Sequence, residues 1–127
     1  LMPMMQFSLA PWRVLDERLC GICRDYAKLH CAFGPYIMKW AEHAAKTGEP
    51  ILRSMDYEFP GQGFGDVMTQ FMLGPDWLVA PVITPENRVT VRLPAGKWTD
   101  DLDATHEGPR TLELTDVPLE RLPRFHR

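Results

Sequence analysis

The 127-residue sequence lacks the features that mark several large classes of protein. No run approaches the ~18 consecutive apolar residues of a membrane-spanning helix. No basic leader precedes an apolar segment with a small-residue cleavage site. Neither sign of charge dominates, because 14 basic residues stand against 17 acidic ones, for a net charge of −3. The composition therefore favours neither a nucleic acid nor an anionic membrane as a partner.

Cysteine is also scarce, and its three copies form no disulfide framework. They are odd in number and lie close together at Cys20, Cys23 and Cys31, unlike a secreted disulfide scaffold. We therefore expect a reducing, cytoplasmic setting. With His30 they form the one metal-like cluster, but on a single helix His30 and Cys31 would lie ~10–12 Å beyond the first pair. One tetrahedral zinc ion could not reach all four, so we expect small core residues and no metal or other cofactor.

Apolar residues, at 45% of the chain, are sufficient for a folded core and exclude disorder as a description of the whole. The chain begins inside an apolar run at Leu1 and ends at Arg127, where a strand pattern is only starting. Self-contained domains usually start and stop in polar linkers. We therefore expect a piece of a longer protein.

The first half reads as a strand followed by helices. The bulky run from Met4 to Leu9 predicts a buried strand. Asp16 is a suitable N-cap for the apolar residues that follow at helical spacing up to Phe33. Gly34-Pro35 predicts an interruption and the start of a second helix, which should end at Gly48.

Short strand patterns, separated by proline and glycine residues typical of turns, dominate the second half. Ile51 to Phe59 reads as extended. An apolar run from Leu78 to Ile83 and the alternation from Val89 to Leu93 predict strands, the second with one buried face. Pro94-Ala95-Gly96 predicts a turn before a further strand at Lys97. From about Asp66 onward the pattern is typical of antiparallel β structure.

Four blocks, in order, resemble motifs of glycoside hydrolase family 31, the α-glucosidase family. Pro3 to Trp12 resembles the eighth barrel strand, "P-F-x-R-x-H". Gly34 to Pro60 resembles "L-x-P-Y-L-Y-x-x-x-x-E-A-x-x-x-G-x-P-x-x-R-P-L-x-x-E-F-P". Gln70 to Asp101 resembles "D-Q-F-x-L-G-x-x-L-L-V-A-P-V" and then "V-x-L-P-x-G-x-W-Y-D". Val117 to Arg127 resembles "x-P-L-D-R-I-P-V-F-V-R", which opens a later strand.

This resemblance implies an α/β region followed by an all-β region. Residues 1–65 would be strand 8, helix 8 and crossover of a (β/α)8 TIM barrel, and 66–127 a partial proximal β-sandwich domain. The family implies retaining hydrolysis of α-glycosides by two carboxylates ~5 Å apart. In relatives both are aspartates on earlier strands, which would precede Leu1. Neither motif is matched by the aspartates of this chain: Asp16, Asp25, Asp56, Asp66, Asp76, Asp100, Asp101, Asp103 and Asp116. We therefore expect no catalytic residue and no activity of this chain alone, with an oligosaccharide or α-glycoside as the substrate of the whole enzyme.

Gln6 and Ser8 are the candidate substrate-binding residues. The resemblance aligns Ser8 with a histidine that bonds a sugar hydroxyl in many relatives, and Gln6 with an arginine two positions before it. Barrel sites lie at the C-terminal ends of the strands. Both side chains can donate and accept hydrogen bonds, and strand alternation would point them to the same side. The departure from the family pattern suggests a different sugar preference or an altered pocket. Alternatively, both residues only satisfy backbone groups inside a barrel.

Other polar and aromatic groups have structural explanations. Among the tryptophans only Trp12 follows the predicted strand closely enough to approach a sugar, and core packing is the alternative there too. The acidic stretch from Asp100 to Glu107 predicts a solvated turn, since its spacing matches no EF-hand loop. For the protein as a whole, two rival functions stay open. One is a non-catalytic carbohydrate-binding or interaction β module, and the other is a truncated inactive remnant.

Overall fold

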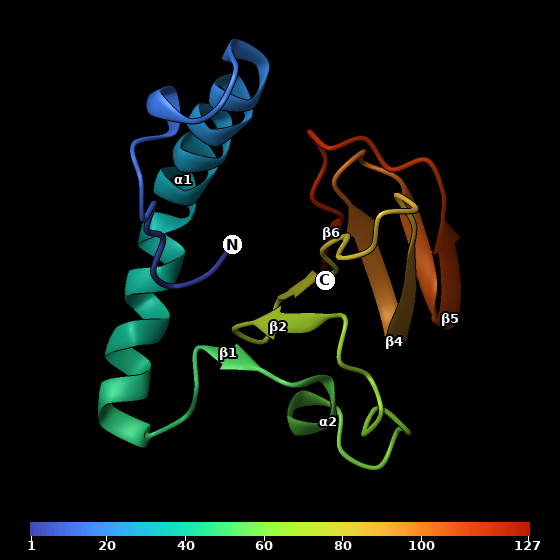
Figure 1. Cartoon of the computed structure of the whole chain (residues 1–127). Helices are drawn as coiled ribbons and strands as arrows, with labels where there is room; N and C mark the ends of the chain where they lie inside the picture. The colour runs from blue at the N-terminus through green and yellow to red at the C-terminus, as the bar shows by residue number, and fades with distance from the viewer. The chain divides into compact units, whose positions relative to one another are not determined.

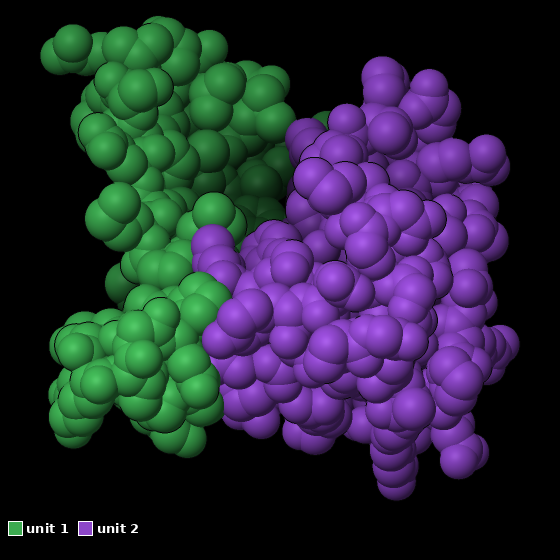
Figure 2. Space-filling model, turned by 90° about the horizontal axis from the view of Figure 1, so that it is seen from below, with its two compact units in different colours: residues 1–51 green, residues 52–127 purple.

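The computed structural model describes all residues from Leu1 to Arg127, and the chain divides into two compact units. The first is Leu1–Ile51 and the second is Leu52–Arg127, shown in different colours in Figure 2. The first unit contains one long helix and no strand, whereas every strand belongs to the second unit (Figure 1). Among the helices there is none whose length and apolarity together would suit a membrane span.

The first unit consists of an irregular N-terminal segment, the 3-10 helix η1 (Pro11–Arg13) and the α-helix α1 (Glu17–Thr47). Both ends of α1 are as predicted. The side chain of Asp16 accepts a hydrogen bond from the backbone nitrogen of Leu19 at 2.8 Å, which satisfies one of the unpaired amides of the first turn. At the other end Gly48 has a φ of 79°, the left-handed conformation that glycine adopts at little cost.

The predicted break at Gly34-Pro35 is wrong, because α1 is one helix of 31 residues with Pro35 inside it. Proline removes a single backbone donor from a helix interior and crowds the carbonyl four residues earlier. Apolar residues at helical spacing continue on both sides of Pro35. The backbone hydrogen bonds before and after Pro35 therefore keep α1 a single helix.

The predicted strand from Met4 to Leu9 is also wrong. The segment has no strand structure, and the side chains at its two ends are 87% and 65% exposed. A strand needs a neighbour to pair its backbone groups. All pairing in this chain takes place within the second unit, so the first ten residues have no such neighbour.

The second unit is a six-stranded antiparallel sheet with the order β1-β2-β3-β6-β4-β5. The strands are β1 (Leu52–Arg53), β2 (Phe71–Leu73), β3 (Trp77–Val79), β4 (Val89–Asp100), β5 (Thr105–Leu114) and β6 (Arg124–His126). This confirms antiparallel β structure in the second half and a strand near the C-terminus. The expectation of a β-sandwich goes further than this one sheet and stays a prediction.

Two local predictions in the second unit fail for identifiable reasons. After the two-residue strand β1 the chain forms the short helix α2 (Met55–Glu58), not an extended segment. The hydroxyl of Ser54 caps it by accepting from the amide of Tyr57 at 3.2 Å. Pro94-Ala95-Gly96 lies inside β4, where the pairing with β5 shifts register between Leu93 and Gly96. A β-bulge takes up the extra residue there, so the strand continues without turning.

The predicted alternation in β4 is confirmed, since Val89, Val91 and Leu93 are buried while Thr90 is exposed. These residues form one core with the fully buried Trp98 and Phe125. The core also takes in Met55 and Phe59, which precede the predicted domain boundary at residue 65. The division between compact units accordingly lies at Ile51 and Leu52. The assignment of residues 1–65 to a barrel stays a prediction.

Candidate functional site

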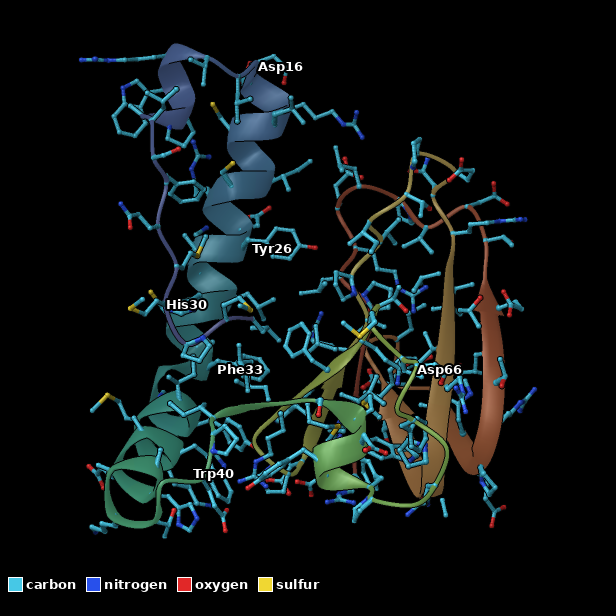
Figure 3. All side chains as sticks on the ribbon, turned by 60° about the horizontal axis from the view of Figure 1, so that its bottom comes forward. Asp16, Tyr26, His30, Phe33, Trp40 and Asp66 are labelled. Carbon is cyan, nitrogen blue, oxygen red and sulfur yellow. The ribbon has the colours of Figure 1, made fainter.

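The two predicted sugar-binding residues lie in the irregular N-terminal segment, and both are exposed. Gln6 lines a hollow of about 280 Å³ within the first unit, together with Tyr26 and His30. Figure 3 shows both of these ring side chains on α1, one helical turn apart. The rest of the lining is apolar, from Leu1, Met2, Met4 and Met5. Ser8 does not line this hollow, so the structure does not bring the two predicted residues together.

His30 contributes a buried polar atom to this hollow. Its Nδ1 atom is buried and has no hydrogen-bond partner in the structure. A buried polar atom without a partner costs about 1–3 kcal/mol, so this atom favours a ligand or water molecule that bonds to it. An amide, a phenol and an imidazole can all bond to hydroxyl groups. Gln6, Tyr26 and His30 are thus the side chains of this hollow that can bond to hydroxyl groups.

The sequence pattern alone does not mark Tyr26 or His30 as site residues. His30 stands with the cysteine cluster, and Tyr26 falls on the helical spacing of the bulky residues between Asp16 and Phe33. A signal was nevertheless present, because residues four apart on a helix share a face. Knowing that Gln6 lies against that face required the tertiary structure.

The cysteine cluster is spread along α1. All three thiols are free, and no group of three or more His, Cys, Asp or Glu side chains in the chain could hold a metal ion. Cys20 and Cys23 line a second, apolar hollow of about 260 Å³ in the first unit, which also includes Phe7 and Trp12. Trp12 is 77% exposed, so the alternative of core packing is wrong for this residue.

The acidic turn after β4 is only partly solvated. Asp100 is buried, and its carboxylate accepts hydrogen bonds from the amides of Leu102 and Ala104 and pairs with Nε2 of His106, each at 2.9 Å. Burial is the largest single influence on the pKa of Asp100, and it acts to raise this pKa. The hydrogen bonds from His106 and the two amides lower it and together outweigh burial, so the pKa of Asp100 lies below its ordinary value. This carboxylate closes the β4–β5 hairpin.

The carboxylate of Asp101 is also fixed by a side-chain partner. Asp101 forms a two-pronged ion pair with Arg121, with nitrogen–oxygen distances of 2.9 and 3.0 Å. The hydrogen bond from this pair is the main cause that raises the pKa of Arg121 above its ordinary value. Bidentate pairs of this kind fix geometry as well as charge. Both acidic residues are therefore structural and are not free for acid–base chemistry.

A third carboxylate links three elements of the second unit. Glu58 of α2 pairs with Arg53 of β1 at 2.7 Å and with Arg127, next to β6, at 2.9 Å. The Arg127 guanidinium also lies over the rings of Phe59 and Trp98. The residues of this cluster are paired with one another, as expected for a structural role.

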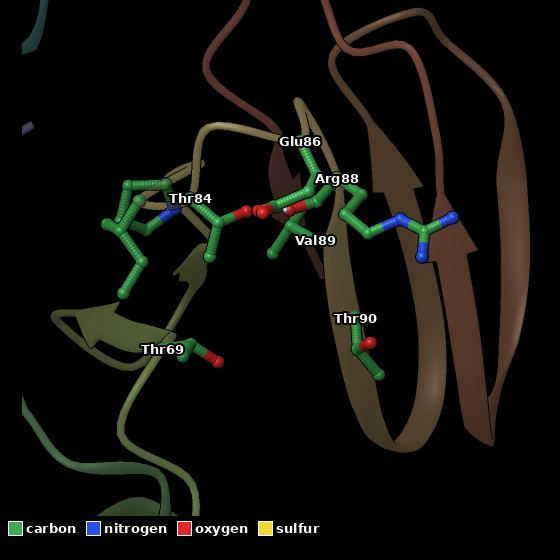
Figure 4. A pocket seen from close by; sticks show the side chains of 8 residues that line it. Thr69, Thr84, Glu86, Arg88, Val89 and Thr90 are labelled. Atoms are coloured by element: carbon green, nitrogen blue, oxygen red, sulfur yellow. Dashed lines mark hydrogen bonds between the residues drawn. The ribbon is translucent and has the colours of Figure 1, made fainter.

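The second unit has its own surface hollow, of about 260 Å³, shown in Figure 4. Threonine hydroxyls of Thr69, Thr84 and Thr90 line it with the side chains of Glu86 and Arg88. Two of these hydroxyls are already used, since Thr84 donates to the Arg88 carbonyl and Thr90 to Glu113. None of the predicted site residues lies there.

Comparison with known proteins decides the family. Residues 48–127 match the glycosyl hydrolase family 31 C-terminal domain. The chain belongs to glycosyl hydrolase family 31. This confirms the resemblance found in the sequence motifs and places the sheet unit within the matched domain.

Relatives extend the similarity over almost the whole chain. The mouse myogenesis-regulating glycosidase is 34% identical over 94% of this chain, which corresponds to 17% of the mouse protein. An alpha-xylosidase of Lactiplantibacillus pentosus is 36% identical over 88% of the chain and 15% of its own length. The chain thus spans about a sixth of the length of these relatives.

Solved structures agree with the fold. A family 31 alpha-xylosidase from a soil metagenome, in complex with xylose, is 34% identical, with a TM-score of 0.82 over 88% of this chain and 17% of its own. A dextranase of Flavobacterium johnsoniae in complex with glucose is 28% identical, with a TM-score of 0.87 over 94% of this chain and 15% of its own. The similarity covers both compact units, although the family domain match begins only at residue 48.

Proposed function

We propose that this chain forms part of a retaining α-glycoside hydrolase and contributes one wall of its sugar pocket. Family membership carries the proposal, because the two relatives compared above, which match most of the chain, are a glycosidase and an alpha-xylosidase. Relatives of known structure contain xylose or glucose. In this proposal α1 of the first unit is the last helix of a barrel. The second unit continues into the C-terminal β domain.

The chemistry would come from outside this chain. Retaining hydrolysis needs one carboxylate as nucleophile and a second as acid and then base, about 5–5.5 Å apart. Asp100, Asp101 and Glu58 are already bound to His106, arginine or backbone partners. These ties support the proposal that the chain positions substrate and does not itself attack the anomeric carbon.

Gln6 is the residue we assign to substrate binding, with Tyr26 and His30 as the polar groups of the same hollow. Ser8, two residues further along the segment, stays a candidate for the same wall. Each neutral hydrogen bond to a sugar hydroxyl contributes about 0.5–1.5 kcal/mol. Loss of one such bond from the transition state would lower kcat/KM by about 3- to 10-fold.

The test has two parts. The purified 127-residue chain should release no aryl leaving group from a panel of aryl α-glycosides. A chimera in which this chain replaces the matching segment of the Lactiplantibacillus pentosus alpha-xylosidase should be active. In that chimera, Gln6→Ala should lower kcat/KM by about 3- to 10-fold, and the exposed control Gln62→Ala should leave it unchanged.

Specific turnover by the chain alone would contradict the placement of the catalytic groups. An active chimera that Gln6→Ala leaves unchanged would instead contradict only the assignment of Gln6. An inactive chimera that still folds, by circular dichroism, would count against the proposed role of this segment in a pocket wall.

A further inference from the structure

A pair of thiols on α1 has no part in the proposed sugar chemistry. Cys20 and Cys23 are three residues apart on one helix and line the same hollow of about 260 Å³. Both are free and only partly buried. Cys31, on the same helix, does not line that hollow and is exposed. The two thiols are thus set apart from the third by their shared surroundings.

Helix geometry limits what the pair can do. Side chains three residues apart on a helix have Cβ atoms about 5–6 Å from each other. A disulfide needs Cβ atoms about 3.5–4.5 Å apart, closer than helical spacing places this pair, and both thiols are free in the structure. Two metal–sulfur bonds of about 2.3 Å span about 4.6 Å between sulfur atoms, a separation compatible with Cβ atoms about 5–6 Å apart.

The number of ligands limits the choice of metal. Structural zinc takes four ligands, and no third His, Cys, Asp or Glu joins the pair. Soft thiolates suit Cu(I), zinc and iron–sulfur clusters, but structural zinc and the clusters take four protein ligands. A soft ion with filled d orbitals, such as Cu(I), accepts two thiolates in a linear arrangement. We infer that Cys20 and Cys23 form a two-coordinate site for Cu(I).

The surroundings of the thiols suit such a complex. The hollow is lined mainly by apolar groups, including Phe7, Pro11 and Trp12, and an apolar shell restricts solvent access to a metal. Binding of Cu⁺ to two thiols releases two protons and leaves a complex with one negative charge. Arg24 lines the same hollow and supplies positive charge beside it. The hydrogen bond from Cys20 to the carbonyl of Leu15, at 3.7 Å, would be given up.

The experiment uses the reduced 127-residue chain without oxygen, titrated with Cu(I) against the chelator bicinchoninate. We expect one equivalent of tightly bound copper and an X-ray absorption spectrum with two sulfur neighbours. Cys20→Ser and Cys23→Ser should each weaken the apparent affinity by about 100-fold or more, because the second ligand of a chelate binds intramolecularly. The matched control Cys31→Ser should bind as the wild type does.

A second measurement needs no variant and is independent of how well the variants fold. Bound Cu(I) should protect Cys20 and Cys23 of the wild-type chain from alkylation, as read by mass spectrometry, while Cys31 stays reactive. Equal alkylation of all three with and without copper would overturn the proposal. So would copper binding of unchanged affinity in a Cys20→Ser, Cys23→Ser double variant. Because none of these readouts involves sugar turnover, their failure would leave the proposed hydrolase role untouched.

Discussion

Replacing Gln70 with leucine is expected to destabilise the second unit by about 3 kcal/mol. Gln70 is 4% exposed, and its amide exchanges two hydrogen bonds with the backbone of Arg92. Nε2 donates to the Arg92 carbonyl at 2.9 Å, and the Arg92 amide donates to Oε1 at 2.8 Å. Along this side β4 pairs with β6 only at Thr99 and Asp100. The Gln70 side chain therefore takes the place of a neighbouring strand.

The magnitude follows from the groups left behind. Leucine is close to glutamine in size but leaves the part-buried N–H and carbonyl of Arg92 without these partners, at about 1–3 kcal/mol each. Burial of the more apolar leucine side chain stabilises the fold by on the order of 1 kcal/mol. The net loss in the free energy of unfolding is then about 3 kcal/mol. Gln70→Glu keeps an acceptor but sets a carboxylate against the Arg92 carbonyl. Its cost should be greatest at neutral pH and shrink near pH ~4, where a protonated carboxyl can donate again.

Urea denaturation and amide hydrogen exchange of the full chain measure this effect. The exposed control Gln62→Leu makes the same chemical change without touching a strand and should be nearly neutral. In Gln70→Leu the Arg92 amide should lose protection more than its neighbours in β4 do. If the free energy of unfolding changes by less than about 0.5 kcal/mol and the Arg92 amide stays protected, the reasoning is refuted.

Two further predictions concern the β4–β5 hairpin. The folded pKa of Asp100 is lowered, so its contribution to stability is present above the unfolded pKa of about 4 and is lost as pH falls through the folded value. Asp100→Asn should therefore lower stability at neutral pH and flatten the acid loss of stability in urea titrations below pH ~4; an unchanged acid limb would contradict the pairing with His106. A Cβ at Gly108 would overlap the carbonyl oxygen of Pro94. Gly108→Ala should thus cost about 1–3 kcal/mol or more in thermal or urea unfolding, whereas Gly65→Ala, with open space around it, should be tolerated; equal effects would contradict the close approach of the strands.

Local pattern determined much of the secondary structure. Asp16 and Gly48 mark the ends of α1 because caps depend on a few neighbouring backbone groups. The alternation from Val89 to Leu93 marks a strand with one buried face because successive side chains point to opposite sides. Motifs in the sequence were also sufficient to place the chain in family 31, which the comparisons show.

Only the tertiary structure decided which groups that are distant in sequence bond to one another. Gln70 stands in a family motif, yet its bonds to Arg92 cross 22 residues and could not be read from local spacing. The turn predicted at Pro94 fails because strand β5 pairs on both sides of it and the bulge absorbs the extra residue. The N-terminal strand fails for the opposite reason, since no strand in this chain pairs with Met4 to Leu9. Sequence fixes local conformation through neighbouring atoms, whereas pairing and burial depend on which distant segments are present to be bonded.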